Sequence, residues 1–311
     1  MRIRATVAAV TGALALSALA VPAAQAVGTS SPSHADIARL AQAARHLDSG
    51  TSAYTGSVGA VGDPYALDLT FSNVKVNKGK PIVAGISNAV SAPVTYTVTH
   101  AVGIDVNAGD FYMDVELYRG SSYDDPTGLL IGDDWPTCTA VSTTQDTCTG
   151  TIDIYPHDDL VNADATTWKA GGYALDFNGQ DPTDENLDMS KVGFASQGDL
   201  ATTKLQRYSK LTVNAAPEPV KKNKTVTVTG SLTRANWETH KYAGYTNQPV
   251  KLQFRKKGSS TYTTLKTVTS SSTGALKTTT TATVDGYYRY SFAGTSTTPA
   301  VNATGDYVDV Q

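Results

Sequence analysis

The chain has 311 residues and a net charge of −3, and 40% of its residues are hydrophobic while 17% are charged. Beyond residue 26, no apolar run approaches the roughly 18 to 20 residues that a membrane-spanning helix needs. We therefore expect no membrane span. We also expect no nucleic-acid partner. The modest charge and abundant Thr, Ser, Gly and Ala are typical of an extracellular all-β protein.

The N-terminal stretch has the pattern of a secretory signal peptide. Arg2 and Arg4 precede an apolar run from Ala5 to Val21, and small residues follow up to Ala26. This pattern predicts a signal peptide over 1–26 with cleavage after Ala26. The mature protein is then expected outside the cytoplasm, either extracellular or loosely associated with the cell wall.

One short helix is predicted after the signal. Apolar residues recur at helical spacing between Ser33 and Leu47, Ser33 could cap the helix, and Gly50 ends the pattern. The stretch 49–62 has the composition of a linker. Because the apolar stripe is narrow, we expect the segment 27–62 to be a mobile arm or a loosely docked one.

Strand patterns then fill residues 63–209, the first predicted domain. The clearest strand alternates between two faces over 111–118, with Tyr112, Asp114, Glu116 and Tyr118 on the more polar face. The predicted strands are 66–76, 81–87, 94–102, 111–118, 128–131, 148–155, 173–177 and 192–195. Short strands separated by turn residues indicate a β-sandwich.

A second domain is predicted over 210–311. Its expected strands are 210–213, 225–232, 249–255, 262–268, 276–283, 287–293 and 306–310. Seven short strands over about a hundred residues are typical of an immunoglobulin-like sandwich. The predicted fold class is therefore all-β, with two immunoglobulin-like β-sandwich domains in tandem after a signal peptide and one short helix.

The two predicted domains differ strongly in charge. Residues 27–209 contain 23 acidic and 10 basic residues, a net charge of −13, whereas residues 210–311 contain 5 acidic and 13 basic residues, a net charge of +8. Such asymmetry favours a domain boundary near residue 209. The domains are expected to bind different partners, or to attract each other.

Several segments of the second domain have a familiar pattern. They are Lys210–Ala215, Gly230–Ala235, Gln253–Gly258 and Tyr290–Gly294. Together they resemble the immunoglobulin-like module of secreted proteins from streptomycetes and related actinobacteria. The resemblance implies the fold and secretion, and it hints at calcium because some members are labelled calcium-binding. It supplies no catalytic residue.

Cys138 and Cys148 are the only cysteines in the chain. In a secreted protein an isolated pair predicts a disulfide. Strand patterns flank both residues, so we expect the bond to staple a hairpin or loop. A redox pair with two intervening residues beside a helix is not present here.

An acidic loop in the first domain offers oxygen ligands. Calcium takes six to eight oxygens, and the candidate ligands are Asp176, Asn178, Asp181, Asp184 and Asp188. A second candidate loop is 105–110. The alternative is that Asp and Asn occupy these positions because they stabilise turns. Bound calcium would also relieve the repulsion among the excess negative charges of this domain.

Enzyme motifs are missing from the sequence. It has no nucleophile elbow, no zinc-protease helix motif and no phosphate-binding glycine loop. His157 beside Asp158 and Asp159 is the only histidine in an acidic setting. We expect no enzymatic activity, while noting that a triad is recognised by geometry rather than by sequence position.

Basic and aromatic residues of the second domain suggest a binding role. The basic residues are Lys221, Lys222, Lys224, Arg255, Lys256 and Lys257, and the aromatic ones are Trp237, Tyr242, Tyr245, Tyr287, Tyr288 and Tyr290. The sequence predicts a secreted, non-enzymatic binding or structural protein of the cell envelope or extracellular space. Its expected partner is an anionic wall polymer or an extracellular protein, with calcium as a possible cofactor. The alternative is an enzyme inhibitor acting through 132–148, or an unrecognised hydrolase.

Overall fold

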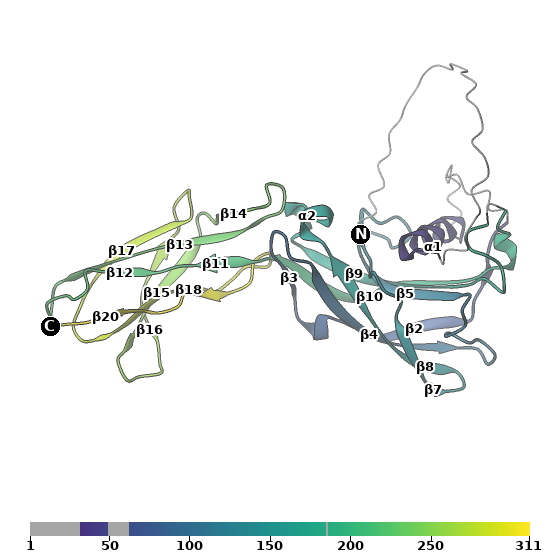
Figure 1. Cartoon of the computed structure of the whole chain (residues 1–311), viewed down its shortest axis with the longest axis horizontal. Helices are drawn as coiled ribbons and strands as arrows, with labels where there is room; N and C mark the ends of the chain where they lie inside the picture. Colours follow the sequence, from purple (N-terminus) through teal and green to yellow (C-terminus); the bar gives the residue numbers. More distant parts are fainter. Residues whose placement is uncertain (1–31, 49–61, 185) are drawn as a thin grey trace, which may run out of the picture. The chain divides into compact units, whose positions relative to one another are not determined.

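The structure is a computed structural model that describes residues 32–48, 62–184 and 186–311. The predicted signal peptide lies outside these residues. The described chain is mostly β-strand, with two α-helices, α1 (His34–Asp48) and α2 (Pro156–Asp159) (Figure 1). Within the described ranges, no helix has the length and hydropathy to cross a membrane.

The chain divides into two compact units. Unit 1 comprises the described residues up to Val76 together with those of Pro93–Ile152 and Lys169–Ala201. Unit 2 comprises Asn77–Ala92, Asp153–Trp168 and Thr202–Gln311. Unit 2 therefore includes three stretches of the first predicted domain, namely 77–92, 153–168 and 202–209.

Two sheets form the first sandwich. One has the strand order β2 (Leu69–Val76), β4 (Val90–His100), β8 (Gln145–Ile154) and β7 (Thr137–Ser142). The other has the order β1 (Tyr65–Ala66), β10 (Gly193–Arg207), β9 (Thr167–Asp176), β5 (Phe111–Arg119) and β6 (Gly128–Leu130), and β3 (Ile82–Ala84) also pairs with β10. The spatial orders β2-β4-β8-β7 and β10-β9-β5-β6 correspond to the two sheets of an immunoglobulin-like sandwich.

The second sandwich repeats this plan. In one sheet, β13 (Thr225–Asn236) pairs with β11 (Ser209–Leu211), β12 (Asn214–Ala216), β14 (Lys241–Gly244) and β17 (Ala275–Thr281). In the other, β16 (Thr263–Thr269), β15 (Pro249–Lys256) and β18 (Gly286–Phe292) are neighbours, and β19 (Val301–Asn302) and β20 (Asp306–Val308) both pair with β18. The predicted all-β fold of two immunoglobulin-like sandwiches is confirmed.

Two adjacent glycines allow close packing on both faces of β9. A Cβ on Gly171 would lie 2.5 Å from the Tyr123 ring, and one on Gly172 would lie 2.9 Å from the Phe71 ring. Tyr123 packs on the outer face, and Phe71 reaches the inner face from β2. Real Cβ atoms do not approach this closely, so glycine is required at both positions.

Helix α1 is docked, which corrects the expectation of a mobile or loosely docked arm. Ser33 caps it as predicted, since its Oγ accepts a hydrogen bond from the Asp36 N–H at 3.2 Å. One helix face is buried against the outer face of β9 and the loop that follows. The buried members of this cluster are Ile37, Leu40, Ala41, Ala44, Tyr173, Leu175, Phe177, Leu187, Met189, Val192 and Phe194.

The docked helix also explains why both faces of β5 are buried. Asp114 and Glu116, on the predicted polar face, are 3% and 0% exposed. Arg45 of α1 is 1% exposed, and its Nη1 lies 3.1 Å from Glu116 Oε1. Its guanidinium lies 4.1 Å from the centre of the Tyr123 ring, and the Tyr123 hydroxyl donates to Glu116 at 2.5 Å. The buried carboxylate therefore has a charged partner and a hydrogen-bond donor, as burial requires.

A second buried pair lies near the start of α1. His34 Nε2 is 3.1 Å from Asp114 Oδ2, and the imidazole packs against Trp135 with ring centres 3.8 Å apart. Burial alone would lower the pKa of His34. The charges of Asp114 and Glu116 and the backbone carbonyl of Asp133 outweigh burial, so the pKa is raised.

The raised pKa predicts how the stability of unit 1 depends on pH. The contribution of His34 is fully present below its ordinary pKa of 6.5 and is lost as pH rises through the raised value in the folded state. We expect unit 1 to unfold at lower urea concentration at pH 9 than at pH 6, as followed by the NMR amide signals of β5 and β9. His34→Gln should remove much of this difference, whereas His157→Gln, at an exposed position, should preserve it. A His34→Gln profile equal to that of the wild type would contradict the assignment.

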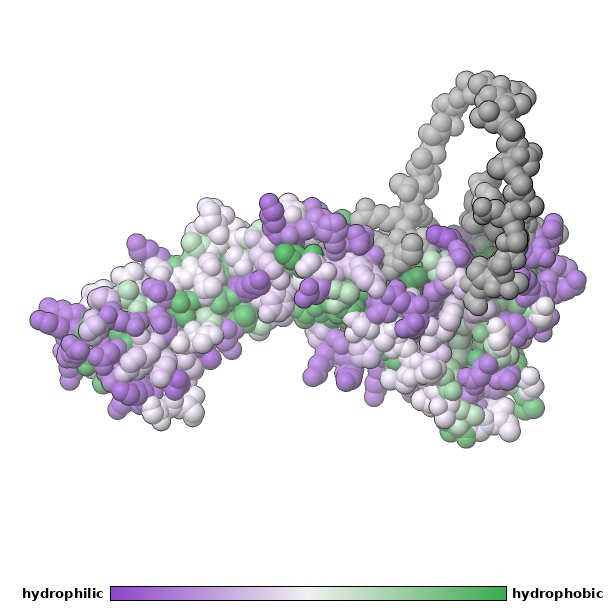
Figure 2. All heavy atoms as spheres, in the orientation of Figure 1, coloured by the Kyte–Doolittle hydropathy of each residue, from purple (hydrophilic) through white to green (hydrophobic). Residues whose placement is uncertain are grey.

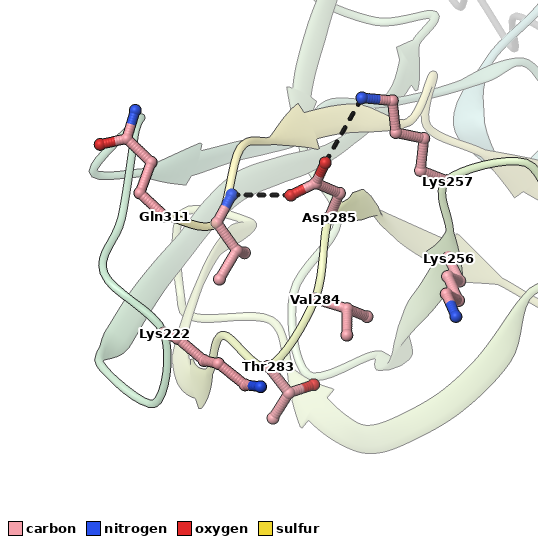
Figure 3. A pocket seen from close by; sticks show the side chains of 8 residues that line it. Lys222, Lys256, Lys257, Thr283, Val284, Asp285 and Gln311 are labelled. Carbon is pink, nitrogen blue, oxygen red and sulfur yellow. Dashed lines mark hydrogen bonds and ion pairs between the residues drawn. The ribbon is translucent and has the colours of Figure 1, made fainter.

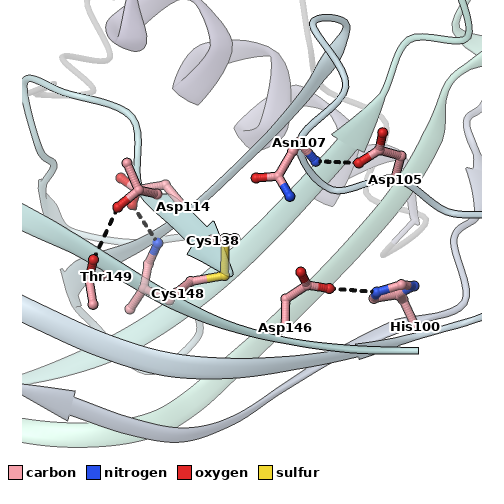
Figure 4. The surroundings of a disulfide bond; sticks show 10 residues. His100, Asp105, Asn107, Asp114, Cys138, Asp146, Cys148 and Thr149 are labelled. Carbon is pink, nitrogen blue, oxygen red and sulfur yellow. Dashed lines mark hydrogen bonds and ion pairs between the residues drawn. A yellow bond between two sulfur atoms is a disulfide. The ribbon is translucent and has the colours of Figure 1, made fainter. Parts of the chain in front are cut away.

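The disulfide forms as predicted and staples the β7–β8 hairpin (Figure 4). Cys138 and Cys148 face each other in register, with their Cα atoms 4.1 Å apart. Beyond the bond, the hairpin is closed by a short turn between Ser142 and Gln145. The strand β7 that it secures is largely exposed.

Candidate functional site

A cavity of about 420 Å³ in unit 2 gathers three lysines. We call it the lysine pocket, and it is lined by Lys222, Lys256, Lys257, Thr283, Val284, Asp285, Val310 and Gln311 (Figure 3). The volume lies in the range of small-ligand sites. The face seen in Figure 2 carries mostly hydrophilic and intermediate residues, with hydrophobic residues scattered among them. What distinguishes this cavity is that three of its eight lining residues are lysines.

Backbone pairing holds Lys222 at the pocket. Its N–H donates to the Gln311 carbonyl at 2.8 Å, and the Gln311 N–H donates to the Val220 carbonyl at 2.9 Å. The turn continues through Asn223, which has a φ of 66°, a conformation that asparagine tolerates well. Because main-chain bonds fix the turn, the lysine side chain is free to serve a ligand.

Lys256 and Lys257 reach the pocket from the end of β15. Gly258 follows them with a φ of 79°, and the Ser259 N–H donates to the Lys256 carbonyl at 3.0 Å, closing a tight turn. The Lys257 N–H donates to the Asp285 carbonyl at 2.9 Å. The turn is thereby tied to the loop between β17 and β18, which lines the same cavity.

One carboxylate offsets part of the positive charge. The pKa of Asp285 is lowered by a hydrogen bond from the Val310 N–H at 2.9 Å and by Lys257, whose Nζ lies 3.3 Å away. The Tyr307 hydroxyl, 3.1 Å from Lys257 Nζ, and Asp285 together raise the pKa of Lys257. Across the described ranges, no acidic side chain forms an ion pair with Lys222 or Lys256. The pocket thus presents two ammonium groups, those of Lys222 and Lys256, that no acidic side chain of the described residues pairs with.

The predicted basic residues are only partly brought together. Lys222, Lys256 and Lys257 line the pocket, whereas Lys221 and Lys224 do not. Arg255 lies on the outer face of β15, where its guanidinium is 4.1 Å from the centre of the Tyr287 ring.

The predicted aromatic residues divide between core and surface. Trp237, Tyr245, Tyr288 and Tyr290 are buried, and the Tyr290 hydroxyl donates to the Val228 carbonyl at 2.9 Å. Tyr242 and Tyr287 are half-buried at the surface. The alternation that placed Tyr288 and Tyr290 on one face, with Tyr287 and Arg289 on the other, is confirmed.

The predicted calcium ligands lie in consecutive turns. Oδ1 atoms of Asp176, Asp181, Asp184 and Asp188 each accept a hydrogen bond from the backbone N–H two residues later. The Asn178 side-chain amide donates to the Tyr65 hydroxyl and to the Lys191 carbonyl. Over residues 32–48, 62–184 and 186–311, no three His, Cys, Asp or Glu side chains are grouped as metal ligands. The same turn geometry holds at Asp105, whose Oδ1 accepts from the Asn107 N–H (Figure 4).

Besides His34, two further histidines that lie beside carboxylates are engaged structurally. His100 is buried, with Nε2 2.8 Å from Asp146 Oδ2 and Nδ1 3.0 Å from the Ala101 carbonyl (Figure 4). Both ring nitrogens are therefore occupied, which leaves no nitrogen to activate a nucleophile. His157 lies in α2 with Nδ1 3.0 Å from Asp158, and its ring stacks on His240 with centres 3.9 Å apart.

The sequence analysis did not identify two of the residues that line the pocket, nor two tyrosines of the neighbouring sheet. Asp285 and Val310 were not singled out, because the pairing of the chain's last strand with β18 is not visible in the sequence pattern. Tyr262 and Tyr307 were also missed. Tyr307 shares the outward face of its neighbour Tyr287, so extending the period-two alternation across β18 and β20 could have found it.

The comparisons with known proteins give structural similarity only. No family model matches the chain, and no curated protein matches it. The full ectodomain of mouse nectin-like molecule 4 is 12% identical with a TM-score of 0.22, and the match covers 76% of this chain and 63% of that one. Dpr2 Ig1–Ig2 in complex with DIP-Theta Ig1–Ig3 matches with 12% identity, a TM-score of 0.23, and 76% and 98% coverage. Tandem Ig repeats of Dlar match with 8% identity, a TM-score of 0.19, and 79% and 99% coverage. At these scores the assignment of the fold rests on strand order.

Proposed function

We propose that this chain is a secreted, non-enzymatic binding protein that attaches to an anionic polymer of the cell envelope through the lysine pocket. The observation that carries the proposal is the convergence of Lys222, Lys256 and Lys257 on one cavity whose lining contains a single acidic side chain. That carboxylate, Asp285, is already bonded to Lys257 and to the Val310 N–H. An anionic group entering the cavity would meet two ammonium groups without competing for them.

The chemistry of lysine fits a repeating polyanion. An ammonium group is a compact charge on a flexible stem, and it binds oxyanions without strict geometry. Individual contacts of this kind are weak at an exposed surface. A polymer compensates, because neighbouring anionic groups bind at high effective concentration once the first is held.

Secretion is supported by two independent features. The sequence pattern over 1–26 is that of a signal peptide. The Cys138–Cys148 bond is of the kind that persists in oxidising compartments outside the cytoplasm. Both features agree with a cell-envelope or extracellular location.

The proposal predicts salt-sensitive retention on purified cell walls. Exposed ion pairs are screened by salt, so the full chain should sediment with walls at low salt and be released at high salt. Lys222→Ala/Lys256→Ala should weaken retention by about tenfold, given roughly 0.2 to 1 kcal/mol for each exposed contact and repetition along the polymer. The control Lys241→Ala/Lys277→Ala removes the same charge at exposed positions outside the pocket. Equal weakening by both variants, or retention insensitive to salt, would contradict a specific pocket.

Calcium binding by the acidic loop stays a prediction. The support for it is the number of carboxylate and amide oxygens between Asp176 and Asp188. The carboxylates accept backbone hydrogen bonds within the turns, and they still have lone pairs with which to bind a cation. A thermal midpoint that rises with calcium but not with magnesium, and that no longer rises in Asp181→Ala/Asp184→Ala, is the expected result if calcium binds there.

A further inference from the structure

The outer face of the sheet beside the lysine pocket carries a second group of cations. We call it the arginine–tyrosine face, made of Arg255, Tyr262, Tyr287, Arg289 and Tyr307. All five side chains are half-buried. They come from β15, β18 and β20 and from the residue preceding β16, so they share one side of one sheet.

Strand register sets this arrangement. Arg255 is paired with Tyr287, which is paired in turn with Tyr307, so these three residues form a row across the strands. The neighbouring pair on the same face is Gln253 and Arg289. Because alternate residues point to opposite faces, Tyr288 and Tyr290 fill the core while Tyr287 and Arg289 stay outside.

Both guanidinium groups are held in place by neighbours. Arg255 lies 4.1 Å from the Tyr287 ring centre, and Arg289 lies 3.8 Å from the Tyr262 ring centre. Arg289 Nε donates to Gln253 Oε1 at 2.9 Å, and Arg255 Nη1 donates to the Ser259 carbonyl at 2.5 Å. Such preorganisation reduces the entropy that a ligand must overcome.

The face is cationic, and the carboxylate that contacts it is Asp285, which accepts a hydrogen bond from the Tyr307 hydroxyl at 3.1 Å and is already paired with Lys257. In the part of the chain that the structure describes, no carboxylate forms an ion pair with Arg255 or Arg289, and their remaining guanidinium nitrogens have no hydrogen-bond acceptor. Unpaired guanidinium groups with a fixed plane match planar oxyanions such as carboxylates, which they bind through two parallel hydrogen bonds.

The face is continuous with the lysine pocket. The Tyr287 and Tyr307 rings lie 5.2 Å apart, and the Tyr307 hydroxyl lies 3.1 Å from Lys257 Nζ, which lines the pocket. A single chain could therefore contact both places. It would meet guanidinium groups and tyrosine rings at one end and ammonium groups at the other.

We propose that the arginine–tyrosine face and the lysine pocket together bind an acidic polysaccharide, a polymer of sugar rings bearing carboxylates. The inference rests on the proposed function and specifies its ligand class. The guanidinium groups would bind the carboxylates. The arginines cover one face of the Tyr287 and Tyr262 rings. Sugar rings would therefore contact the remaining ring surface and the hydroxyls of the tyrosines, which combine apolar and polar character as sugars do.

The test is calorimetric binding of the full chain to polygalacturonate in the presence of EDTA, compared with neutral dextran and with inorganic polyphosphate. Polygalacturonate should bind more tightly than polyphosphate, and dextran should not bind. Arg289→Lys keeps the charge but loses the planar pair of donors, so it should weaken polygalacturonate binding about fivefold to tenfold. Its effect on polyphosphate should be smaller. Lys241→Ala is the control for charge and should leave both affinities close to those of the wild type.

The outcomes separate this inference from the function on which it rests. If polyphosphate and polygalacturonate bind equally and Arg289→Lys and Tyr262→Ala change neither, the arginine–tyrosine face is not a polysaccharide site, while polyanion binding through the pocket stands. If neither polyanion binds the wild-type protein, the proposed function itself fails. Circular dichroism of each variant establishes that a loss of binding does not come from unfolding.

Discussion

Arg45→Ala is expected to lower the free energy of unfolding of unit 1 by about 3 to 5 kcal/mol, the usual cost of leaving one member of a buried ion pair alone. Arg45 and Glu116 are 1% and 0% exposed, and Arg45 Nη1 lies 3.1 Å from Glu116 Oε1. Without the guanidinium, the Tyr123 hydroxyl is the one hydrogen-bond donor that Glu116 keeps among the described residues. The measurement is urea unfolding followed by the NMR amide signals of α1, β5 and β9, because Trp168 and Trp237 would contribute to tryptophan fluorescence beside Trp135.

Arg39→Ala is the matched control. Arg39 lies on the same helix, but its ion pair with Asp36 is about half exposed on both sides. Such pairs contribute about 0 to 1 kcal/mol. Equal losses from Arg39→Ala and Arg45→Ala would contradict the docking of α1 on β5 and β9.

The loss of stability in Arg45→Ala should also depend on pH. Burial raises the pKa of Glu116, and Arg45 opposes this effect. As pH falls and Glu116 is protonated, the difference in free energy of unfolding between Arg45→Ala and the wild type should therefore shrink. Arg45→Ala/Glu116→Gln should recover part of the loss at neutral pH.

Reduction of the Cys138–Cys148 disulfide is expected to cost about 3 kcal/mol of unit 1 stability. The estimate is the loop-closure entropy of a short ring in the unfolded chain, and the two cysteines are separated by 10 positions. Cross-strand register already places them face to face, so the folded hairpin should change little when the bond opens. Urea unfolding with and without reductant measures the difference.

The control for reduction uses the same hairpin. Thr139→Ala/Thr147→Ala alters an exposed cross-strand pair next to the disulfide and leaves the covalent ring intact. We expect a change within about 0.5 kcal/mol, as for most surface substitutions. If reductant leaves the free energy of unfolding unchanged, the prediction that the disulfide stabilises unit 1 by lowering the entropy of the unfolded chain is wrong.

Most strands could be predicted because their alternation is local. The alternation over 111–118 predicted β5 to within one residue, and the pattern over 287–293 predicted β18 and its inward tyrosines. Strands β7, β12, β14 and β19 were missed, since short polar strands have no apolar alternation to reveal them. The prediction over 192–195 found only the start of β10, which continues to Arg207 through exposed and half-buried residues.

The docking of α1 depended on a long-range match that no local pattern reveals. Taken alone, Asp114 and Glu116 indicate a solvent-exposed strand face, and the helix has a narrow apolar stripe. Both features are explained together, because His34 and Arg45 extend the stripe of α1 and pair with those two carboxylates. The sequence signal was the spacing of His34, Ile37, Ala41 and Arg45 on one helix face.

The sequence revealed the basic residues of the candidate site but not their convergence on one cavity. Adjacent Lys256 and Lys257 were visible as a basic turn, and Lys222 as part of another. Their convergence depends on the parallel bridge between Val220 and Val310, and on the bond from the Lys257 N–H to the Asp285 carbonyl. These contacts join segments far apart in the chain, so only the folded structure brings the lysines to one cavity.

The most direct test of the central claim is a titration of the isotope-labelled full chain with polygalacturonate, followed by amide chemical shifts. If the lysine pocket binds the polymer, the largest shifts should fall at Lys222, at Lys256–Gly258 and at Thr283–Asp285, and added salt should reverse them. Shifts confined to unit 1, or no saturable shifts at low salt, would contradict the account.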